Sequence, residues 1–305
     1  MARTRYAPDR GLTSRMLVTM FLLGLVYVVF VGAFFVIAPR WGGFALAAAA
    51  VFLLAQYFFS DRLTLFAMHG REVSPAEAPE LHGVVDRICA LSDTPKPRVA
   101  VADTDMPNAF ATGRNQRKAV VCVTTGLLRR LDPVELEGVL AHEMAHIAHR
   151  DVAVMTIASF LGVCAGLITR VGLEWGLWGG FNRRNGEQNT GLVLLAVVAV
   201  SAVAYGVSFV LTRALSRYRE LSADRAGALL TGRPSALASA LTKVSGEIAR
   251  IPTRDLRAAE PFNAFFFAPA FAKGFSVSAL FATHPPLDRR LAQLQKISAQ
   301  LGRGE

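Results

Sequence analysis

The chain has 305 residues, of which 52% are hydrophobic and 18% are charged, with a formal net charge of +10 and a mean hydropathy of +0.36. This hydrophobicity excludes an intrinsically disordered chain, and 3 cysteines are too few for a disulfide-rich scaffold. The charged fraction lies below the quarter that is typical of soluble domains.

Four apolar windows account for the missing charge. They are residues 16–38, 41–59, 152–169 and 191–211, which together comprise 81 residues and contain no charged side chain, whereas the other 224 residues are 25% charged. A helix needs about 20 apolar residues to cross the hydrocarbon core of a bilayer. The windows therefore predict four transmembrane helices, and the first is too long to be the apolar core of a cleaved signal peptide.

Positive residues near the span ends predict the orientation in the membrane. Four arginines precede the first span and four follow the fourth: Arg3, Arg5, Arg10, Arg15, Arg213, Arg217, Arg219 and Arg225. We therefore expect a multi-pass protein of the cell (inner or plasma) membrane whose residues 1–15, 60–151 and 212–305 face the cytoplasm. The lipid bilayer is the expected partner. No nucleic acid is expected, because the basic residues form no stripe with aromatics.

The two longer soluble segments predict an α+β fold that is mainly helical with a small β-sheet. Apolar residues recur at helical spacing over 76–91, and 98–102, 108–112 and 118–124 have the composition of strands. A final amphipathic helix is expected after Pro286, with its apolar face formed by Leu287, Leu291, Leu294, Ile297 and Leu301. The Phe-rich stretch 262–281 has no clear period and is expected to be a loop.

A helix that begins after Asp132 contains the motif H-E-x-x-H. Asp132, Pro133 and Glu135 form a typical helix start, and His142 and His146, four residues apart, leave the same face of the helix. That spacing suits two nitrogen ligands of one Zn²⁺, with Glu143 as general base towards a metal-activated water. The motif predicts a metallopeptidase with one zinc ion per chain.

Catalytic zinc requires a third protein ligand. The H-E-x-x-H-x-x-G-x-x-H class is excluded, because residue 149 is His and residue 152 is Val. Topology places Glu174 and Glu187 on the opposite side of the membrane. The candidates that remain downstream are Glu220, Asp224, Glu247, Asp255, Glu260 and His284. Glu220 and Asp224 lie four residues apart on one helix face, so one can bind the metal while the other accepts a hydrogen bond from a ligating imidazole.

Several segments resemble the HtpX-type membrane zinc endopeptidases, to which the CAAX prenyl proteases are related. They are Arg219-Glu220-Leu221-Ser222-Ala223-Asp224, Asn108-Ala109-Phe110-Ala111 and His284-Pro285-Pro286, together with two apolar windows on each side of H-E-x-x-H. The resemblance implies a zincin-like cytoplasmic protease domain in two halves, 60–151 and 212–305, separated by the second pair of spans.

The resemblance also implies roles for individual residues. Glu220 would be the third zinc ligand. Asp224 would accept a hydrogen bond from a ligating histidine, and His284 would stabilise the oxyanion. Substrate would add as a strand along Asn108, Ala109, Phe110 and Ala111. The implied function is hydrolysis of peptide bonds in misfolded or damaged membrane proteins.

Two alternatives remain at this stage. A CAAX prenyl protease would share the chemistry and would be distinguished by cleavage of a prenylated peptide. A non-catalytic membrane scaffold would carry a degenerate site and would contain little zinc. The sequence does not predict the physiological substrate, a regulator or the oligomeric state.

Overall fold

The computed structural model describes residues 10–37, 68–113, 115–175, 188–248 and 284–302, together with Leu65, Phe66 and a few residues between 43 and 58. The chain divides into two compact units. Unit 1 comprises Met1–Leu12, Phe58–Ala153 and Ser216–Glu305, and unit 2 comprises Thr13–Tyr57 and Val154–Leu215.

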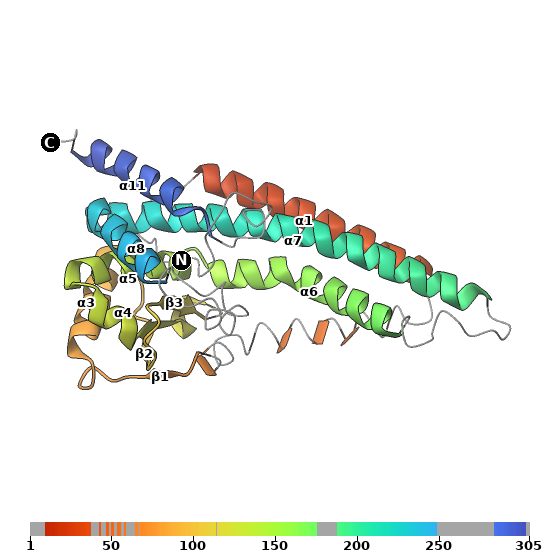
Figure 1. Cartoon of the computed structure of the whole chain (residues 1–305), viewed down its shortest axis with the longest axis horizontal. Coiled ribbons are helices and arrows are strands. Elements are labelled where there is room, and N and C mark those ends of the chain that lie inside the picture. Colours follow the sequence, from red (N-terminus) through yellow and green to blue (C-terminus); the bar gives the residue numbers. More distant parts are fainter. Residues whose placement is uncertain are drawn as a thin grey trace. The chain divides into compact units, whose positions relative to one another are not determined.

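Unit 2 contains most of three long helices, which are α1 (Arg10–Ile37), α6 (Asp151–Trp175) and α7 (Gln188–Thr231) (Figure 1). Among the described residues, two stretches are long and apolar enough to cross a membrane, Thr13–Ala33 and Leu195–Thr231. They correspond to the first and fourth predicted spans. The third appears as a shorter apolar helix, Ala158–Arg170, and the window 41–59 lies largely outside the described residues.

Small residues let the helices of unit 2 pack closely. Phe30 of α1, Ala165 of α6 and Ala204 of α7 form one buried apolar cluster. A Cβ atom on Gly166 would lie only 3.1 Å from the ring of Tyr205, so the glycine leaves room for that ring. Ala165 and Gly166, in the third apolar window, are therefore positions of helix–helix contact, as is common between membrane helices.

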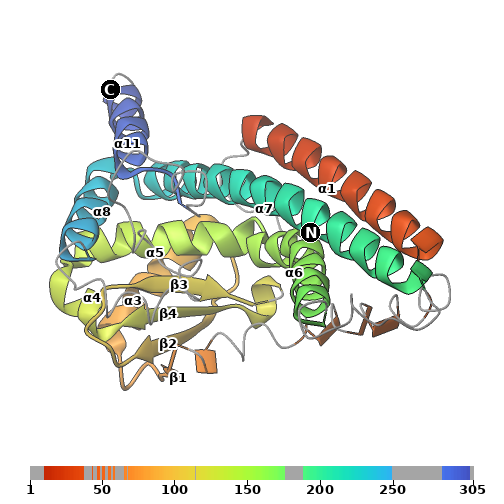
Figure 2. The same ribbon diagram turned by 45° about the vertical axis from the view of Figure 1, so that its right-hand side comes forward.

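Unit 1 is built on a four-stranded sheet with the order β1-β2-β4-β3 (Figure 2). Its strands are β1 (Gly70–Glu72), β2 (Arg98–Ala102), β3 (Ala109–Thr112) and β4 (Val120–Thr124). β2 and β4 are parallel, and the other two pairs are antiparallel. The three predicted strands are confirmed, whereas β1 was not predicted because three residues are too few to show an alternating pattern.

Helices cover one face of this sheet. The predicted helices are confirmed as α3 (Pro79–Ser92), α5 (Pro133–Ala148), the end of α7 that carries Glu220 and Asp224, and α11 (Leu287–Leu301). The helices α4 (Thr125–Arg130) and α8 (Pro234–Ile248) and the short 3₁₀ helix η1 (Gln116–Lys118) were not predicted. One apolar core joins the sheet to α3, α5, α7, α8 and α11. A smaller cluster that includes Phe110 and Cys122 covers the other face. The predicted loop 262–281 lies outside the described residues.

Helix α5 lies at the centre of unit 1. It begins with the predicted capping box, in which the Asp132 carboxylate accepts a hydrogen bond from the Glu135 backbone amide and the Glu135 side chain accepts one from Asp132. Every residue from Glu135 to Ile147 is buried. A helix that is buried on all sides is a core element, so the H-E-x-x-H residues do not lie on a solvated surface helix.

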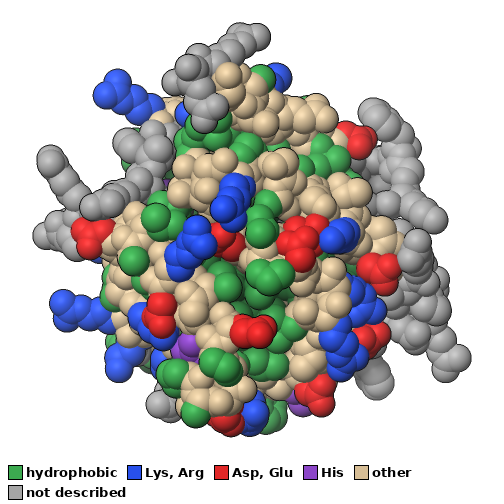
Figure 3. Space-filling model, turned by 90° about the vertical axis from the view of Figure 1, so that its left-hand side faces the viewer, with side chains coloured by type: hydrophobic (Ala, Val, Ile, Leu, Met, Phe, Trp, Pro, Cys, Tyr) green, Lys and Arg blue, Asp and Glu red, His purple; other side chains and the backbone are tan. Residues whose placement is uncertain are grey.

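One face of the molecule has mixed charge. Figure 3 shows Lys and Arg side chains interspersed with Asp and Glu, with small apolar areas between them. Glu247, which topology left open as a metal ligand, instead forms an ion pair with Arg130, with Oε2 3.2 Å from Arg130 Nε.

Replacing Gly227 by alanine is expected to destabilise unit 1. A Cβ atom there would lie 2.9 Å from the backbone nitrogen of His142, so α7 would have to move away from α5 at the H-E-x-x-H motif. Overpacking of this kind costs about 1–3 kcal/mol, which outweighs the helix-propensity gain of about 1 kcal/mol. Thermal melting in detergent would measure the loss. Gly246→Ala is the matched control, because nothing lies within 4 Å of its added Cβ; equal melting temperatures for the two variants would contradict the prediction.

Candidate metal centre

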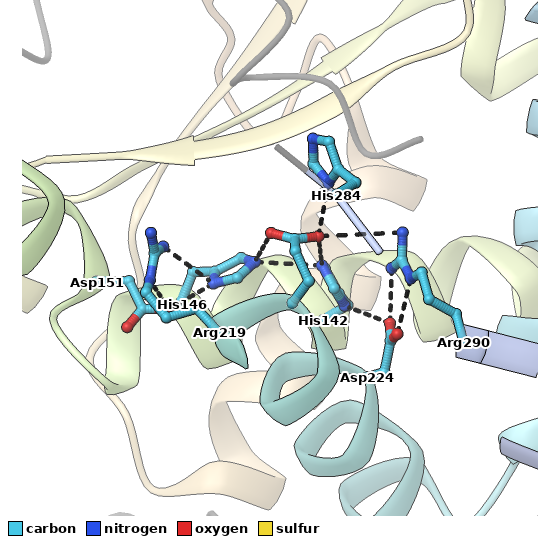
Figure 4. A network of polar contacts seen from close by, with 8 residues as sticks. His142, His146, Asp151, Arg219, Asp224, His284 and Arg290 are labelled. Carbon is cyan, nitrogen blue, oxygen red and sulfur yellow. Dashed lines mark hydrogen bonds and ion pairs between the residues drawn. The ribbon is translucent and has the colours of Figure 1, made fainter. Parts of the chain in front are cut away.

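The site in unit 1 brings together side chains from four helices and the segment before α11. α5 supplies His142, Glu143 and His146, and α7 supplies Glu220 and Asp224. Asp151 is the first residue of α6, His284 precedes α11, and Arg290 lies on α11. Figure 4 shows Asp151 and Arg219 beside His146, and Asp224 and Arg290 beside His142, with the two imidazoles between these pairs. The site therefore depends on segments that are up to 148 residues apart in sequence.

Both imidazoles direct Nε2 toward the Glu220 carboxylate. His142 Nε2 lies 3.6 Å from Glu220 Oε2, His146 Nε2 lies 3.4 Å from Glu220 Oε1, and the two Nε2 atoms are 3.2 Å apart. His142 is 1% exposed and His146 is 7% exposed. Buried groups at these distances form a preorganised cluster of three donor atoms, all within 4.8 Å of one another.

The spacing of these atoms fits a divalent zinc ion. Donor atoms about 2.0–2.1 Å from a tetrahedral centre lie roughly 3.3 Å apart, which agrees with the separations between the three side chains. The charges also fit. Four buried carboxylates, on Glu143, Asp151, Glu220 and Asp224, face two guanidinium groups, and a dication would balance the remaining charge while the imidazoles are neutral.

The opposite ring nitrogen of each histidine contacts a carboxylate. His142 Nδ1 lies 2.9 Å from Asp224 Oδ1, and His146 Nδ1 lies 2.6 Å from Asp151 Oδ2. A carboxylate at Nδ1 holds the proton there and leaves the lone pair of Nε2 free for a metal. Burial opposes a charged imidazole, but hydrogen bonds to Asp151 and Glu220 outweigh it and raise the pKa of His146 to about 10.

Arginines accompany both of these carboxylates. Arg290, which is fully buried, binds Asp224 through two nitrogens, with Nε 2.7 Å from Oδ2 and Nη2 2.6 Å from Oδ1. Arg219 forms an ion pair with Asp151 through Nε at 3.0 Å. Bidentate pairing fixes the plane of the carboxylate as well as its charge. Asp224 is therefore held rigidly between α11 and the first histidine.

Glu143 lies between the two histidines in sequence, and its carboxylate is buried. Burial raises the pKa of Glu143 above its ordinary value, and the neighbouring histidines and a hydrogen bond from the Ala111 backbone partly offset that rise. The contact with Ala111 also brings the N-A-F-A strand to the site. A buried carboxylate beside the two imidazoles is placed to act as a general base.

The N-A-F-A residues occupy the edge strand β3 and the residue before it. Asn108 is fixed through its backbone, which donates to Thr124 Oγ1 and accepts from Thr124 N, both at 2.9 Å. Phe110 packs into the smaller apolar cluster, whereas Ala109 and Ala111 face the core that contains α5. β3 pairs with β4 on one side, and no described strand pairs with its other edge.

His284 contacts Glu220, the acidic residue of the cluster. Its Nδ1 is 2.9 Å from Glu220 Oε2, and its buried Nε2 has no hydrogen-bond partner among the described residues. The structure therefore brings together His142, Glu143, His146, Glu220, Asp224 and His284 in one buried cluster. Asp255 and Glu260, two of the open alternatives, lie outside the described residues.

Asp151 and Arg290 were not predicted from the sequence, and Arg219 was assigned no role at the site. Asp151 follows His146 by five residues, a spacing that does not share a face in a continuous helix. Arg290 lies in an amphipathic helix where arginine is ordinarily solvated. The only available signal was indirect: a predicted cluster of buried carboxylates requires cationic partners.

Comparisons with known proteins agree with the geometry. The sequence profile of Peptidase family M48 matches residues 75–298. The chain is 62% identical over 300 residues to Protease HtpX homolog 1 of Streptomyces coelicolor, which covers 98% of this chain and 97% of that protein. It is 52% identical over 300 residues to the Protease HtpX homolog of Moorella thermoacetica, with 98% of each chain covered.

A solved structure shares the fold. Ste24p of S. mikatae superposes with a TM-score of 0.53 at 17% sequence identity, covering 94% of this chain and 67% of that one. A likeness at this identity concerns the fold alone, so the family assignment rests on the sequence matches. With two relatives of about the same length at 50% identity or more, and a profile match across both halves of the site, the chain belongs to peptidase family M48, within its HtpX group.

Proposed function

We propose that this chain is an integral-membrane, zinc-dependent endopeptidase with Glu143 as general base. The observation that carries the proposal is the convergence of His142 Nε2, His146 Nε2 and the Glu220 carboxylate in a buried cluster beside Glu143. The family supports a metal-dependent peptidase. The donor set of two imidazoles and one carboxylate supports zinc, one ion per chain.

Each residue of the site has a separate role in the proposed reaction. A bound zinc ion would supply Lewis-acid activation of the scissile carbonyl and of the attacking water. Glu143 accepts the proton of the water and passes it to the leaving amine. His284, when protonated, donates from Nε2 to the developing negative charge on the carbonyl oxygen while Nδ1 stays on Glu220. Asp224 holds His142 in the ligating tautomer.

The edge strand β3 is the proposed docking site for substrate. An extended peptide can add to an open strand edge through main-chain hydrogen bonds. Asn108, Ala109, Phe110 and Ala111 would present that edge, and the contact of Ala111 with Glu143 would bring the bound peptide to the general base. Main-chain hydrogen bonds do not depend on the side chains of the substrate, so this mode of binding suits an endopeptidase whose substrates share no common sequence.

The membrane arrangement is proposed with four spans and a cytoplasmic active site. The two spans that are apparent among the described residues leave large apolar side chains exposed, among them Phe21 and Val28 on α1 and Val203 and Val210 on α7. Exposed apolar surface of this kind suits contact with lipid. The arginines outside the first and fourth windows support the cytoplasmic side. The domain halves 60–151 and 212–305 would then meet beneath the membrane, with misfolded or damaged membrane proteins as substrates.

Removal of the metal is expected to abolish cleavage of casein by the detergent-solubilised protein. A chelator such as 1,10-phenanthroline should reduce the rate to background, and one equivalent of zinc should restore it, because two imidazoles and one carboxylate form the donor set of a zinc site. Metal analysis should give about one zinc per chain. Full activity in zinc-free protein would contradict the proposal, and little zinc with no recovery would favour a non-catalytic scaffold. A farnesylated CAAX peptide cleaved in preference to casein would favour a prenyl protease.

A further inference from the structure

The second histidine of H-E-x-x-H has its own carboxylate, which is separate from the partner of the first. His146 Nδ1 lies 2.6 Å from Asp151 Oδ2, a shorter contact than the 2.9 Å between His142 Nδ1 and Asp224 Oδ1. Asp151 is 1% exposed. Both imidazoles are thus held from the side that faces away from Glu220, as Figure 4 shows.

Arg219 anchors this carboxylate from α7. Its Nε lies 3.0 Å from the same Oδ2 atom of Asp151 that contacts His146, and its side chain is 11% exposed. Arg219 Nη2 also lies 3.5 Å from His146 Nδ1, but a nitrogen that donates its proton to Asp151 cannot accept one from arginine. The shorter contact decides, so Arg219 acts on Asp151 and through it on the imidazole.

A break in the helix places Asp151 beside His146. Five residues along a continuous α-helix would turn Asp151 to a different face. Instead α5 ends at Ala148, and Arg150 adopts a left-handed conformation with φ of 57° before α6 begins. A non-glycine residue in that conformation costs roughly 1 kcal/mol, so surrounding contacts must maintain it. The ion pair and the hydrogen bond of Asp151 are contacts of that kind.

We propose that Asp151, anchored by Arg219, is a positioning residue that holds His146 as a metal ligand. The inference rests on the proposed zinc site. The contact at Nδ1 fixes the tautomer in which Nε2 carries the lone pair and fixes the rotation of the ring, so that Nε2 stays 3.4 Å from Glu220 Oε1. Arg219 and Glu220 are adjacent in sequence, so one turn of α7 supplies both a metal ligand and the anchor of another ligand's support.

A purely structural role for Asp151 explains less of the geometry. An acidic residue in the first turn of α6 is favoured by the helix dipole, but that effect is available to an exposed side chain. Asp151 is buried, and its Oδ1 has no hydrogen-bond partner among the described residues, whereas Oδ2 contacts both His146 and Arg219. The side chain is therefore directed at the imidazole and not at the amides of its own helix.

The test measures metal binding in the metal-free full-length protein in detergent. Zinc affinity is obtained by competition with a chromophoric chelator, and ligand geometry from the d–d absorption of the cobalt-loaded protein. Asp151→Asn is expected to weaken zinc by about 10–100-fold and to shift the cobalt bands, because partners of ligating histidines have effects of this size. Unchanged affinity and bands in a folded Asp151→Asn protein would overturn the proposal.

Glu137→Gln is the matched control. Glu137 lies on α5, the helix of His146, and is 5% exposed. It pairs with Arg87 at 3.0 Å and Arg233 at 3.5 Å and contacts neither imidazole. It is expected to lower the melting temperature of the metal-free protein and to leave zinc affinity within about threefold. Equal losses of zinc affinity in Glu137→Gln and Asp151→Asn would reduce Asp151 to a stabilising residue and overturn the proposal.

Arg219 variants test the anchor and cover the case in which Asp151→Asn does not fold. Arg219→Gln is expected to weaken zinc about tenfold, and Arg219→Lys, which keeps the charge, should recover most of that loss. The double variant Asp151→Asn/Arg219→Gln should lose no more than Asp151→Asn alone, because both act through one contact. Losses that multiply would overturn the anchoring role. Failure of the wild-type protein to bind zinc would refute the proposed function instead, so the two failures are distinguishable.

Discussion

Replacing Glu143 by glutamine is expected to lower peptide hydrolysis by about 10²–10⁴-fold while zinc stays bound. Glutamine matches glutamate in size but cannot accept and deliver a proton. The three donor atoms of the cluster belong to His142, His146 and Glu220, so the substitution leaves the metal site intact. Cleavage of casein and zinc content, measured on the same detergent preparation, give the two quantities that the prediction separates.

The control for this experiment is again Glu137→Gln, six residues earlier on α5. It removes a buried carboxylate and its arginine pairs, yet it lies outside the cluster. Its activity per folded molecule should match the wild type even if less protein folds. Substantial activity in the Glu143→Gln protein would remove Glu143 as the base, and loss of zinc from that protein would show that the carboxylate helps to hold the ion.

Replacing Glu220 by alanine is expected to abolish both metal binding and activity. Glu220 is the only carboxylate within reach of both Nε2 atoms among the described residues, at 3.4 and 3.6 Å. Loss of a ligand should weaken zinc by about 100-fold or more, above the 10–100-fold expected for a residue that only supports a ligand. His284 would also lose its partner at Nδ1. Zinc competition against a chelator measures the effect.

Asp224→Asn and Glu247→Gln are the comparison variants for Glu220. Asp224 contacts His142 and Arg290 and is expected to show the smaller loss of a supporting residue. Glu247, which topology also allowed as a ligand, pairs with Arg130 and should have no effect on zinc affinity. If Asp224→Asn lost more zinc affinity than Glu220→Ala, Asp224 would be the ligand and Glu220 the supporting residue.

Local sequence determined the helix that carries the motif. The capping residues Asp132 and Glu135 and the four-residue spacing of His142 and His146 depend on contacts within one or two turns, so they can be read before the chain is folded. The strands β2, β3 and β4 followed from composition for the same reason. The length of the uncharged windows likewise predicted the two membrane-length helices found among the described residues, because crossing a bilayer depends on length and hydropathy.

The sequence only partly predicted which acidic residue is the third metal ligand. Spacing favoured Glu220 and Asp224 as a pair, and topology excluded residues on the other side of the membrane, but neither ranks one carboxylate above the other. The resemblance to HtpX-type proteases supplied that order. In the structure the order follows from the way α7 meets α5 at Gly227, which sets Glu220 opposite both Nε2 atoms and leaves Asp224 beside His142 Nδ1.

The tertiary structure alone decided the supports of the site. Asp151 reaches His146 because the helix breaks at Arg150, which has a left-handed conformation. Arg290 reaches Asp224 because α11 packs against the core of unit 1. Neither event leaves a periodic signal, since each depends on contacts between segments that are distant in sequence or on a single unusual backbone angle. The sequence by itself therefore determined the chemistry of this protein, through residue types at helical spacing. The folded chain determined how buried charges balance, because a carboxylate acquires its counter-ion only when separate helices meet.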